Sequence, residues 1–325
     1  MEEPQHMNEV VPRLFVGSQV AGSFVDLLKE HGITHILSLG NFESIHDHIV
    51  YKNIRIMDLP EENLIQYFDE SFDFIHNAYE NGGKVLIHCE AGMSRSSALM
   101  TAYLMRTQQL TPQAALDMIK AKRSFAQPNE GFMDQLELYH LLKYKVDTNH
   151  VAYRRFLVAG MAKEHQDTGY IAHLALTPNP QADSQSQLII RCKKCRYVLV
   201  NKEHILDHEP GKGQQAFAYT KRNTDLQSIT AEAPIVTPMQ LNQPLNPLLA
   251  RLGASNNNCS SYFIEPMEWI HALQDGQLEG RMDCPNCTAK LGQYNWSGAQ
   301  CSCGRWITPA FMLHRKQVDE IKRRR

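Results

Sequence analysis

The sequence has little net charge and no long apolar run. Its 325 residues include 33 lysines and arginines against 35 aspartates and glutamates, which gives a formal net charge of −2. We therefore expect no overall electrostatic attraction to nucleic acid or to a membrane surface. No apolar stretch approaches the roughly 18–20 residues of a membrane-spanning helix, and segment 1–6 is polar and acidic. We expect neither a secretory signal nor a membrane partner.

Cysteine is scarce in the first 190 residues, where Cys89 stands alone, while the other seven cysteines lie between Cys192 and Cys303. In a reducing compartment such clustering indicates metal ligation and not a disulfide framework. A free thiol at Cys89 suits the same compartment, so we expect the protein in the cytoplasm and nucleus. The length allows two domains of ordinary size.

Cys89 lies in the run HCEAGMSRS, residues 88–96, between an apolar strand-like run and a helix-like run. A helix N-terminus offers unpaired amides and a partial positive charge, so an anion binds there readily. This field, together with Arg95 and His88, is expected to favour the thiolate form of Cys89. Gly92 lets the backbone close tightly around an oxyanion. The run predicts a phosphate-binding loop with a nucleophilic thiolate.

Strand and helix patterns alternate through residues 8–148. Because strands that alternate with helices form a mostly parallel sheet flanked by helices, we predict an α/β first domain. Cys89 then falls at the carboxyl edge of the sheet, where such folds bind ligands. The predicted strands are 9–18, 34–39, 54–58 and 85–88, and the predicted helices are 24–32, 67–79, 96–109, 111–122 and 129–144.

A phosphate-transfer site also needs a proton donor for the departing oxygen. Asp58 ends a predicted strand and precedes a turn, so its carboxyl could reach over the loop. Aspartate also caps turns in a purely structural role, and Glu61 and Glu62 are the alternative donors. Ser96 and Asn129 each stand where a helix begins, and both could be ordinary helix caps.

Residues 85–97 resemble the phosphate loop of the cysteine-dependent protein phosphatases, His-Cys-x-x-Gly-x-x-Arg-Ser/Thr, in their dual-specificity branch. The resemblance implies a cysteine-dependent phosphatase fold in which Cys89 attacks phosphorus, Arg95 holds the phosphate and catalysis requires no metal. It implies that Asp58, which precedes a helix containing Tyr67-Phe68, is the general acid. It also implies that Ser96 helps the cysteine to leave. The substrate-binding positions are then His88, Glu90, Ala91, Gly92, Met93, Ser94 and Asn129, the last of which steadies the loop in this family.

The variable positions of the loop suggest a substrate class. Glu90, Ala91, Met93 and Ser94 include an acid and no lysine. Several phosphates attract lysines by Coulomb forces, so this loop disfavours inositol lipids and RNA 5′-triphosphate. The domain shows no obvious insertion that would wall a deep phosphotyrosine pocket. We expect phosphoprotein substrates carrying phosphotyrosine, phosphoserine or phosphothreonine.

The second half of the chain is expected to form a small zinc-stapled β-rich domain over 188–325, after a helix and polar linker over 149–187. Two Cys-x-x-Cys knuckles and a Cys-x-Cys pair are typical of tetrahedral zinc sites. Seven cysteines leave two four-ligand sites one donor short, and His208 is the best eighth ligand, with His204 as its competitor. A sequential arrangement assigns Cys192, Cys195, His208 and Cys259 to one zinc and Cys284, Cys287, Cys301 and Cys303 to the other. Spacing alone does not distinguish this from an interleaved arrangement.

Two further segments stand out in this half. Residues 230–258, rich in Pro, Asn, Gln and Leu, are predicted to form a flexible insertion. The basic run 322–325 could be a nuclear import signal or a solvated tail. Segments 261–269 and 294–296 are expected to supply strands for a core that needs its metals to fold.

A dual-specificity loop followed by the segments YFIEP and CSCGRWITPAF resembles the Yvh family of zinc-binding dual-specificity phosphatases across nearly the whole chain. The resemblance implies two structural zinc ions and a role in late assembly of the large ribosomal subunit, with a pre-ribosomal particle as partner. In that role the zinc domain helps to release an assembly factor and catalysis is dispensable. Two hypotheses follow: a phosphoprotein phosphatase, or mainly an assembly adaptor.

Overall fold

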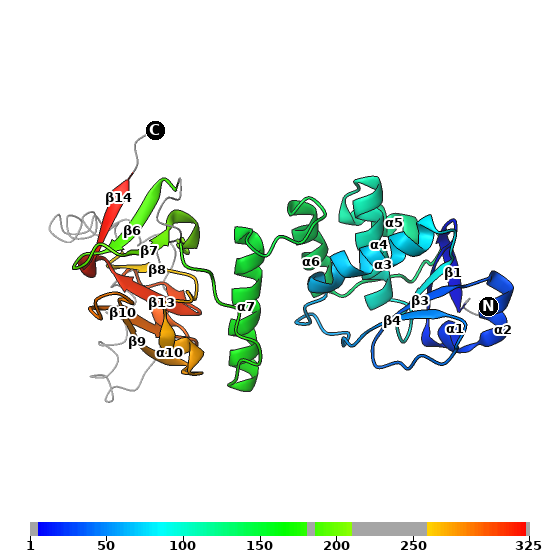
Figure 1. Cartoon of the computed structure of the whole chain (residues 1–325), viewed down its shortest axis with the longest axis horizontal. Helices are drawn as coiled ribbons and strands as arrows, with labels where there is room; N and C mark the ends of the chain where they lie inside the picture. Colours follow the sequence, from blue (N-terminus) through cyan, green and yellow to red (C-terminus); the bar gives the residue numbers. More distant parts are fainter. Residues whose placement is uncertain (1–5, 181–185, 210–258, 323–325) are drawn as a thin grey trace, which may run out of the picture. The chain divides into compact units, whose positions relative to one another are not determined.

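The structure is a computed structural model that describes residues 6–180, 186–209 and 259–322. It divides into two compact units, Met1–Tyr153 and Arg154–Arg325, and Figure 1 labels most of their helices and strands. The predicted insertion 230–258 and residues 323–325 of the basic run lie outside the described residues. Among the helices that are described, none has both the length and the apolar character needed to cross a bilayer.

A five-stranded sheet in the order β1-β2-β5-β3-β4 forms the centre of the first unit. Strands β2, β5, β3 and β4 run parallel to one another. The fifth strand, β1, pairs antiparallel with β2. All four residues of the central strand β5 are buried, as expected for a strand covered on both faces. This confirms the predicted α/β class. The strands are β1 (Met7–Val11), β2 (Leu14–Gly17), β3 (His35–Leu39), β4 (Val50–Ile54) and β5 (Val85–His88).

Helices cover both faces of this sheet. On one face Leu86 of β5 packs with Ala21 and Leu28 from the first two helices. Helix α4 packs against β2, β3 and β5, and its first eleven residues are all buried, which fits the mostly small and apolar residues that follow Arg95. The helices are α1 (Gln19–Ser23), α2 (Val25–His31), α3 (Phe68–Glu80), α4 (Arg95–Gln108), α5 (Pro112–Lys120) and α6 (Glu130–Leu141).

Two local predictions in this unit are wrong. Segment 9–18 is a hairpin of β1 and β2 and not one strand, because Pro12 has no N–H and Arg13 takes a left-handed φ of 68°. The strand predicted at 54–58 lies earlier, as β4. This edge strand leaves Val50 and Asn53 exposed, so its apolar pattern is weak. Residues 55–58 therefore leave the sheet and carry Asp58 to its carboxyl edge.

The described residues of the second unit form three small sheets, in the orders β8-β13-β10-β9, β14-β6-β7 and β11-β12. Its core includes Trp269, Trp296 and Phe311, all nearly inaccessible to solvent. The elements are β6 (Leu188–Cys192), β7 (Val198–Asn201), β8 (Ser261–Phe263), α10 (His271–Gln274), β9 (Glu279–Asp283), β10 (Lys290–Asn295), β11 (Ala299–Gln300), β12 (Trp306–Ile307), β13 (Ala310–His314) and β14 (Val318–Lys322).

Helix α7 (Val151–Thr168) and the segment after it pack on the second core. Val158 and Met161 of α7 are buried there, and Leu176 packs against the same cluster. Arg154 donates a 2.8 Å hydrogen bond to the fully buried carboxylate of Glu265. The expected helix thus extends to Thr168, beyond the start of the segment 163–187 that is expected to be a linker, and that segment contains apolar residues that pack on the core.

Candidate active site and metal centres

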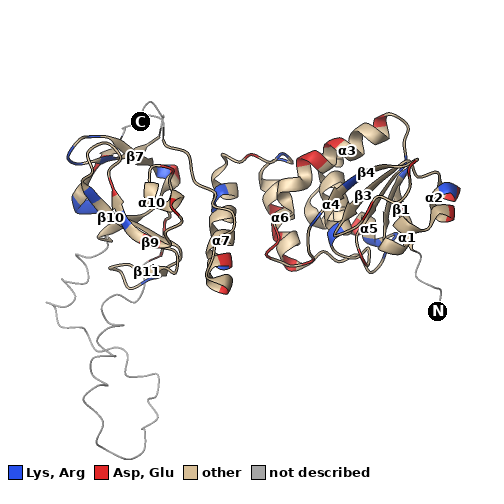
Figure 2. Cartoon of the chain, turned by 60° about the horizontal axis from the view of Figure 1, so that its bottom comes forward, with Lys and Arg blue, Asp and Glu red and all other residues tan. Residues whose placement is uncertain are grey.

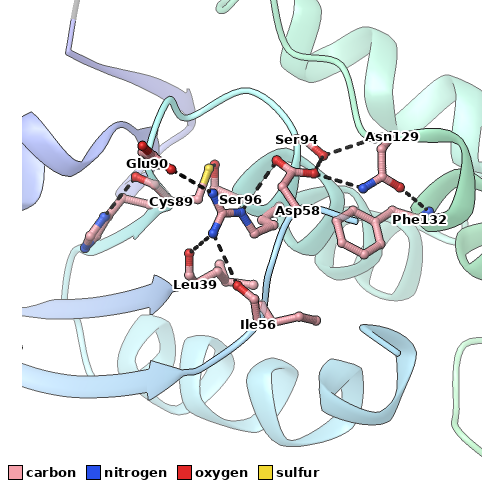
Figure 3. Close-up of polar contacts among 11 residues, drawn as sticks. Leu39, Ile56, Asp58, Cys89, Glu90, Ser94, Ser96, Asn129 and Phe132 are labelled. Atoms are coloured by element: carbon pink, nitrogen blue, oxygen red, sulfur yellow. Dashed lines mark hydrogen bonds and ion pairs between the residues drawn. The ribbon is translucent and has the colours of Figure 1, made fainter. Parts of the chain in front are cut away.

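The predicted phosphate loop connects β5 to the N-terminus of α4 at the carboxyl edge of the sheet. Cys89 is 1% exposed, and its Sγ lies 3.3 Å from the Ser96 hydroxyl. Figure 3 labels both side chains. Gly92 has a φ of 68°, and a Cβ there would clash with the Gly17 carbonyl. The tight loop therefore requires glycine at this position.

Arg95 is held with one edge of its guanidinium facing the site. Nη1 donates to the backbone carbonyls of Leu39 at 3.3 Å and Ile56 at 3.2 Å. Nε lies 3.5 Å from Asp58 Oδ2, and Nη2 lies 3.6 Å from Glu90 Oε2 (Figure 3). The Nε–Nη2 edge is thus presented to anionic oxygens, and this edge can bind two oxygens of a phosphate at once.

Asp58 is tied to the phosphate loop and to α6. Its Oδ1 accepts hydrogen bonds from the Ser94 hydroxyl at 2.6 Å and from Asn129 Nδ2 at 2.9 Å (Figure 3). Asn129 also caps α6, since its Oδ1 accepts from the Phe132 amide. The structure therefore brings together the predicted acid and the asparagine, and Asn129 serves both as a helix cap and as a contact to Asp58.

The loop that carries Asp58 is clamped by Gln135, a residue that sequence reasoning missed. Its side chain is 1% exposed, and Oε1 accepts from the amides of Leu64 at 2.8 Å and Ile65 at 2.9 Å. Nε2 donates to the Glu62 carbonyl at 2.8 Å. The only signal in the sequence is its place on the same helical face as the apolar Phe132 and Leu136. Of the three candidate acids, Asp58 is the one within ion-pair distance of Arg95 in the described contacts.

His88, which is expected from the sequence to favour the thiolate form of Cys89, is buried. It is 4% exposed, and burial lowers its pKa to about 4. The ring is therefore neutral near pH 7, with Nδ1 lying 3.3 Å from the Cys89 carbonyl oxygen. A neutral His88 adds no positive charge beside the thiol, because its strand is covered on both faces and its ring is desolvated.

The remaining loop residues differ in exposure. Glu90, Ala91 and Met93 are exposed, so their side chains border the entrance, whereas Gly92 and Ser94 are buried. Glu90 is 78% exposed at its side chain while approaching Arg95, so an incoming phosphate can displace it at little cost.

In the second unit the eight predicted ligands form two clusters, each with its donor atoms within 4.8 Å of one another. The Cys192–Cys195 knuckle follows β6, and the Cys284–Cys287 knuckle lies in the β9–β10 turn. One cluster is therefore shared by two different sheets. The clusters consist of Cys192, Cys195, Cys284 and Cys287, and of His208, Cys259, Cys301 and Cys303.

The sequential pairing predicted from the chain order is thus wrong, and the arrangement is interleaved. Its physical cause is the packing of two hairpins that are far apart in sequence: Cys192 and Cys287 are separated by 95 residues, and their sulfurs lie 3.7 Å apart. His208 joins the second cluster, with Nε2 3.3 Å from Cys259 Sγ. The competitor His204 is buried and accepts the Asn201 amide through Nδ1, which makes it a structural cap.

Both clusters fit a tetrahedral metal. Thiolates about 2.3 Å from a zinc ion lie about 3.8 Å from one another, and the sulfurs of Cys195 and Cys284 are 3.5 Å apart. A four-cysteine set and a three-cysteine, one-histidine set are typical of structural zinc. These clusters could therefore hold metal ions.

Comparisons with known proteins agree with this geometry. Residues 14–141 match a family described as "Dual specificity phosphatase, catalytic domain". The chain is 35% identical to "Dual specificity protein phosphatase 12" of Homo sapiens, with 97% of this chain and 89% of the relative covered. It is 34% identical to the protein of that name in Rattus norvegicus (98% and 89%) and 31% identical to "Tyrosine-protein phosphatase yvh1" of Schizosaccharomyces pombe (98% and 86%). The match extends over both units, and the chain therefore belongs to the family of dual-specificity protein phosphatases that includes yvh1 and dual specificity protein phosphatase 12.

Proposed function

We propose that the chain hydrolyses phosphotyrosine, phosphoserine and phosphothreonine in proteins through a phosphocysteine at Cys89. The observation that carries this proposal is the convergence of three groups at one sheet edge. Cys89 Sγ lies 3.3 Å from the Ser96 hydroxyl, and the Nε–Nη2 edge of Arg95 meets the Asp58 carboxylate at 3.5 Å. Nucleophile, phosphate ligand and proton donor are all present.

In the first step the Cys89 thiolate attacks phosphorus, and the bond from phosphorus to the substrate oxygen breaks. The Nε–Nη2 edge of Arg95 and the loop amides hold the phosphoryl oxygens, on which negative charge develops. Asp58 gives its proton to the leaving oxygen. Its hydrogen bonds from Ser94 and Asn129 fix the direction of that carboxyl.

In the second step water attacks the phosphorus of the phosphocysteine, and the sulfur–phosphorus bond breaks. Asp58, now a carboxylate, accepts a proton from the water. The Ser96 hydroxyl, 3.3 Å from the sulfur, donates a hydrogen bond to the departing thiolate. Inorganic phosphate is released and the free thiolate is restored.

The surroundings of the loop support a phosphoprotein over a polyanionic substrate. Glu90 lies at the entrance, and α6, which Asn129 caps, contains the acidic residues Glu130, Asp134 and Glu137, coloured red in Figure 2. Carboxylates repel a ligand with several phosphates. A single phosphorylated side chain brings fewer charges and is the better fit.

The test is the variant Cys89→Ser, whose hydroxyl stays protonated at neutral pH. Turnover of an aryl phosphate should fall below detection, while tungstate should still bind because Arg95 and the loop amides remain. Circular dichroism verifies the fold. Readily measurable turnover by Cys89→Ser would contradict the assignment of the nucleophile.

For the second unit we propose two structural zinc ions and a docking role. When bound, the zinc ions supply folding energy to a small core. The ligands Cys192, Cys195, Cys284 and Cys287 would join two sheets, since they come from both. What supports a docking role is that these ligands lie in a unit of their own, separate in the chain from Cys89.

The resemblance to the Yvh family supports a pre-ribosomal particle as the docking partner, in the cytoplasm and nucleus. On this alternative the chain is mainly an adaptor for assembly of the large ribosomal subunit. Cells that lack the endogenous protein separate the two hypotheses. If the chain is mainly an adaptor, Cys89→Ser rescues these cells and Cys284→Ser does not. If phosphatase activity is essential, Cys89→Ser fails to rescue them.

A further inference from the structure

Arg123, which follows α5, is buried behind the phosphate loop. Its side chain is 2% exposed, and Nε donates to the Gly92 carbonyl at 2.6 Å. Nη2 donates to the Ala91 carbonyl at 3.1 Å, and Nη1 donates to Asn8 Oδ1 on β1 at 2.8 Å. One guanidinium thus binds two consecutive carbonyls of the loop and fastens them to the edge of the sheet.

The guanidinium is also fixed from a second side. Its carbon lies 4.3 Å from the centre of the Phe125 ring, in a cation–π arrangement. A Cβ at Gly92 would lie only 2.5 Å from Nη2, closer than van der Waals contact allows, so the loop and the arginine fit closely together. The rotamer of Arg123 is therefore set by its surroundings before any substrate arrives.

The charges around Cys89 suggest that Arg123 also acts electrostatically on the site. Arg95 is flanked by two carboxylates, those of Asp58 and Glu90, at 3.5 and 3.6 Å. His88 is neutral near pH 7, because burial lowers its pKa to about 4. Charged or titratable groups at the loop are Cys89, His88, Glu90, Arg95, Asp58 and Arg123.

Arg123 remains a cation although it is buried. Desolvation lowers its pKa, and the negative charge of Cys89 opposes that lowering. An arginine begins so far above neutral that its guanidinium stays protonated throughout the working range. The Gly92 and Ala91 carbonyls and the Asn8 amide oxygen are uncharged acceptors, so these three bonds do not themselves cancel the charge of the guanidinium.

We propose that Arg123 is a positioning residue of the phosphatase site, which clamps the loop through Ala91 and Gly92 and supplies a buried positive charge that favours the Cys89 thiolate. The inference rests on the proposed role of Cys89 as nucleophile. It assigns to Arg123 the electrostatic contribution that the sequence suggests for His88.

The experiment measures iodoacetamide alkylation of Cys89 as a function of pH in the full chain, by mass spectrometry of the peptide that contains it. Three variants separate clamp from charge. Arg123→Gln removes both, and Arg123→Lys keeps the charge but loses the fork that binds two carbonyls. Asn8→Asp keeps an acceptor for Nη1 and places a negative charge beside Arg123.

We expect Arg123→Gln to raise the pH midpoint of alkylation by about one unit, which is about a tenfold lower thiolate fraction below the midpoint. Asn8→Asp should raise it in the same direction by a smaller amount. Arg123→Lys should stay near the wild-type midpoint while aryl phosphate turnover falls, because the loop is less tightly held. Asn8→Asp keeps the hydrogen bonds of Arg123 to the loop, so it tests the electrostatic role even if Arg123→Gln does not fold.

The matched control is Arg13→Gln. This variant also removes a cation that is stacked on an aromatic ring, that of Tyr79. Arg13 precedes β2, however, so it lies at the amino edge of the parallel strands, away from the phosphate loop at their carboxyl edge. Its midpoint should match the wild type. Equal shifts in Arg123→Lys and Arg123→Gln, or an unchanged midpoint in Asn8→Asp, would overturn the electrostatic role. Failure of the proposed function itself would be seen elsewhere, as aryl phosphate turnover by Cys89→Ser.

Discussion

Replacing Gln135 with leucine should destabilise the first unit and disturb the loop that carries Asp58. The side chain makes three hydrogen bonds, to two amides and one carbonyl of residues 62–65, and it is 1% exposed. Leucine fills a similar volume but leaves these backbone groups without that partner. A buried unsatisfied group costs about 1–3 kcal/mol. The Leu64 amide and the Glu62 carbonyl keep a 3.1 Å hydrogen bond to each other. The main cost is therefore the buried Ile65 amide, and we expect a loss of about 1–3 kcal/mol.

Urea unfolding can report this loss separately from the second unit. All three tryptophans, Trp269, Trp296 and Trp306, lie in the second unit, so their fluorescence follows that unit alone. Far-UV circular dichroism follows mainly the helices of the first unit. Gln135→Leu should shift the dichroism transition to lower urea and leave the fluorescence transition in place.

The control is Gln113→Leu on α5, which removes an exposed side chain whose bond is to Asp117 on the same helix. Surface changes of this kind stay within about 0.5 kcal/mol. A Gln135→Leu protein as stable as this control would refute the clamp. So would normal turnover of aryl phosphates with poor leaving groups, since a loosened loop should misplace the acid.

Three further predictions concern the acid, the buried histidine and the metals. Asp58→Asn should slow aryl phosphates with poor leaving groups far more than those with good ones, because only the former need a proton; equal slowing would exclude the acid role. The pKa of His88 is about 4 in the folded chain against 6.5 normally, so between these values the unfolded chain binds a proton that the folded chain does not. Stability of the first unit should therefore fall as pH drops from 6.5 toward 4, by up to about 3 kcal/mol, and His88→Gln should flatten that slope in urea titrations. Cys284→Ser removes one ligand of the cluster that joins two sheets, so elemental analysis should find one zinc ion fewer per chain. The unfolding transition followed by tryptophan fluorescence should move to lower urea, and aryl phosphate turnover should be retained. Full zinc content would contradict the assigned ligand.

The phosphate loop could be predicted from sequence because its chemistry is local. Cys89, Gly92 and Arg95 lie within seven consecutive residues, and the strand before them and the helix after them have clear apolar patterns. The eight metal ligands could also be chosen, since cysteine spacing limits the options. Their partition between two clusters could not, because it depends on how hairpins 95 residues apart pack together.

Residues that act through burial escaped prediction for a related reason. Arg123 and Gln135 are polar, and a sequence pattern places such residues on the surface. Their burial is set by partners distant in the chain: Asn8 is 115 residues from Arg123, and Leu64 is 71 from Gln135. The neutral state of His88 likewise follows from tertiary desolvation, which a motif does not encode.

The most direct measurement of the central claim is the capture of the covalent intermediate. Ser96→Ala removes the hydroxyl 3.3 Å from the Cys89 sulfur, so breakdown of the phosphocysteine should become slow. After brief reaction with an aryl phosphate and a rapid denaturing quench, peptide mass spectrometry should find one phosphoryl group on Cys89. A phosphoryl group on another residue, or turnover with no phosphoryl group on Cys89, would contradict the account.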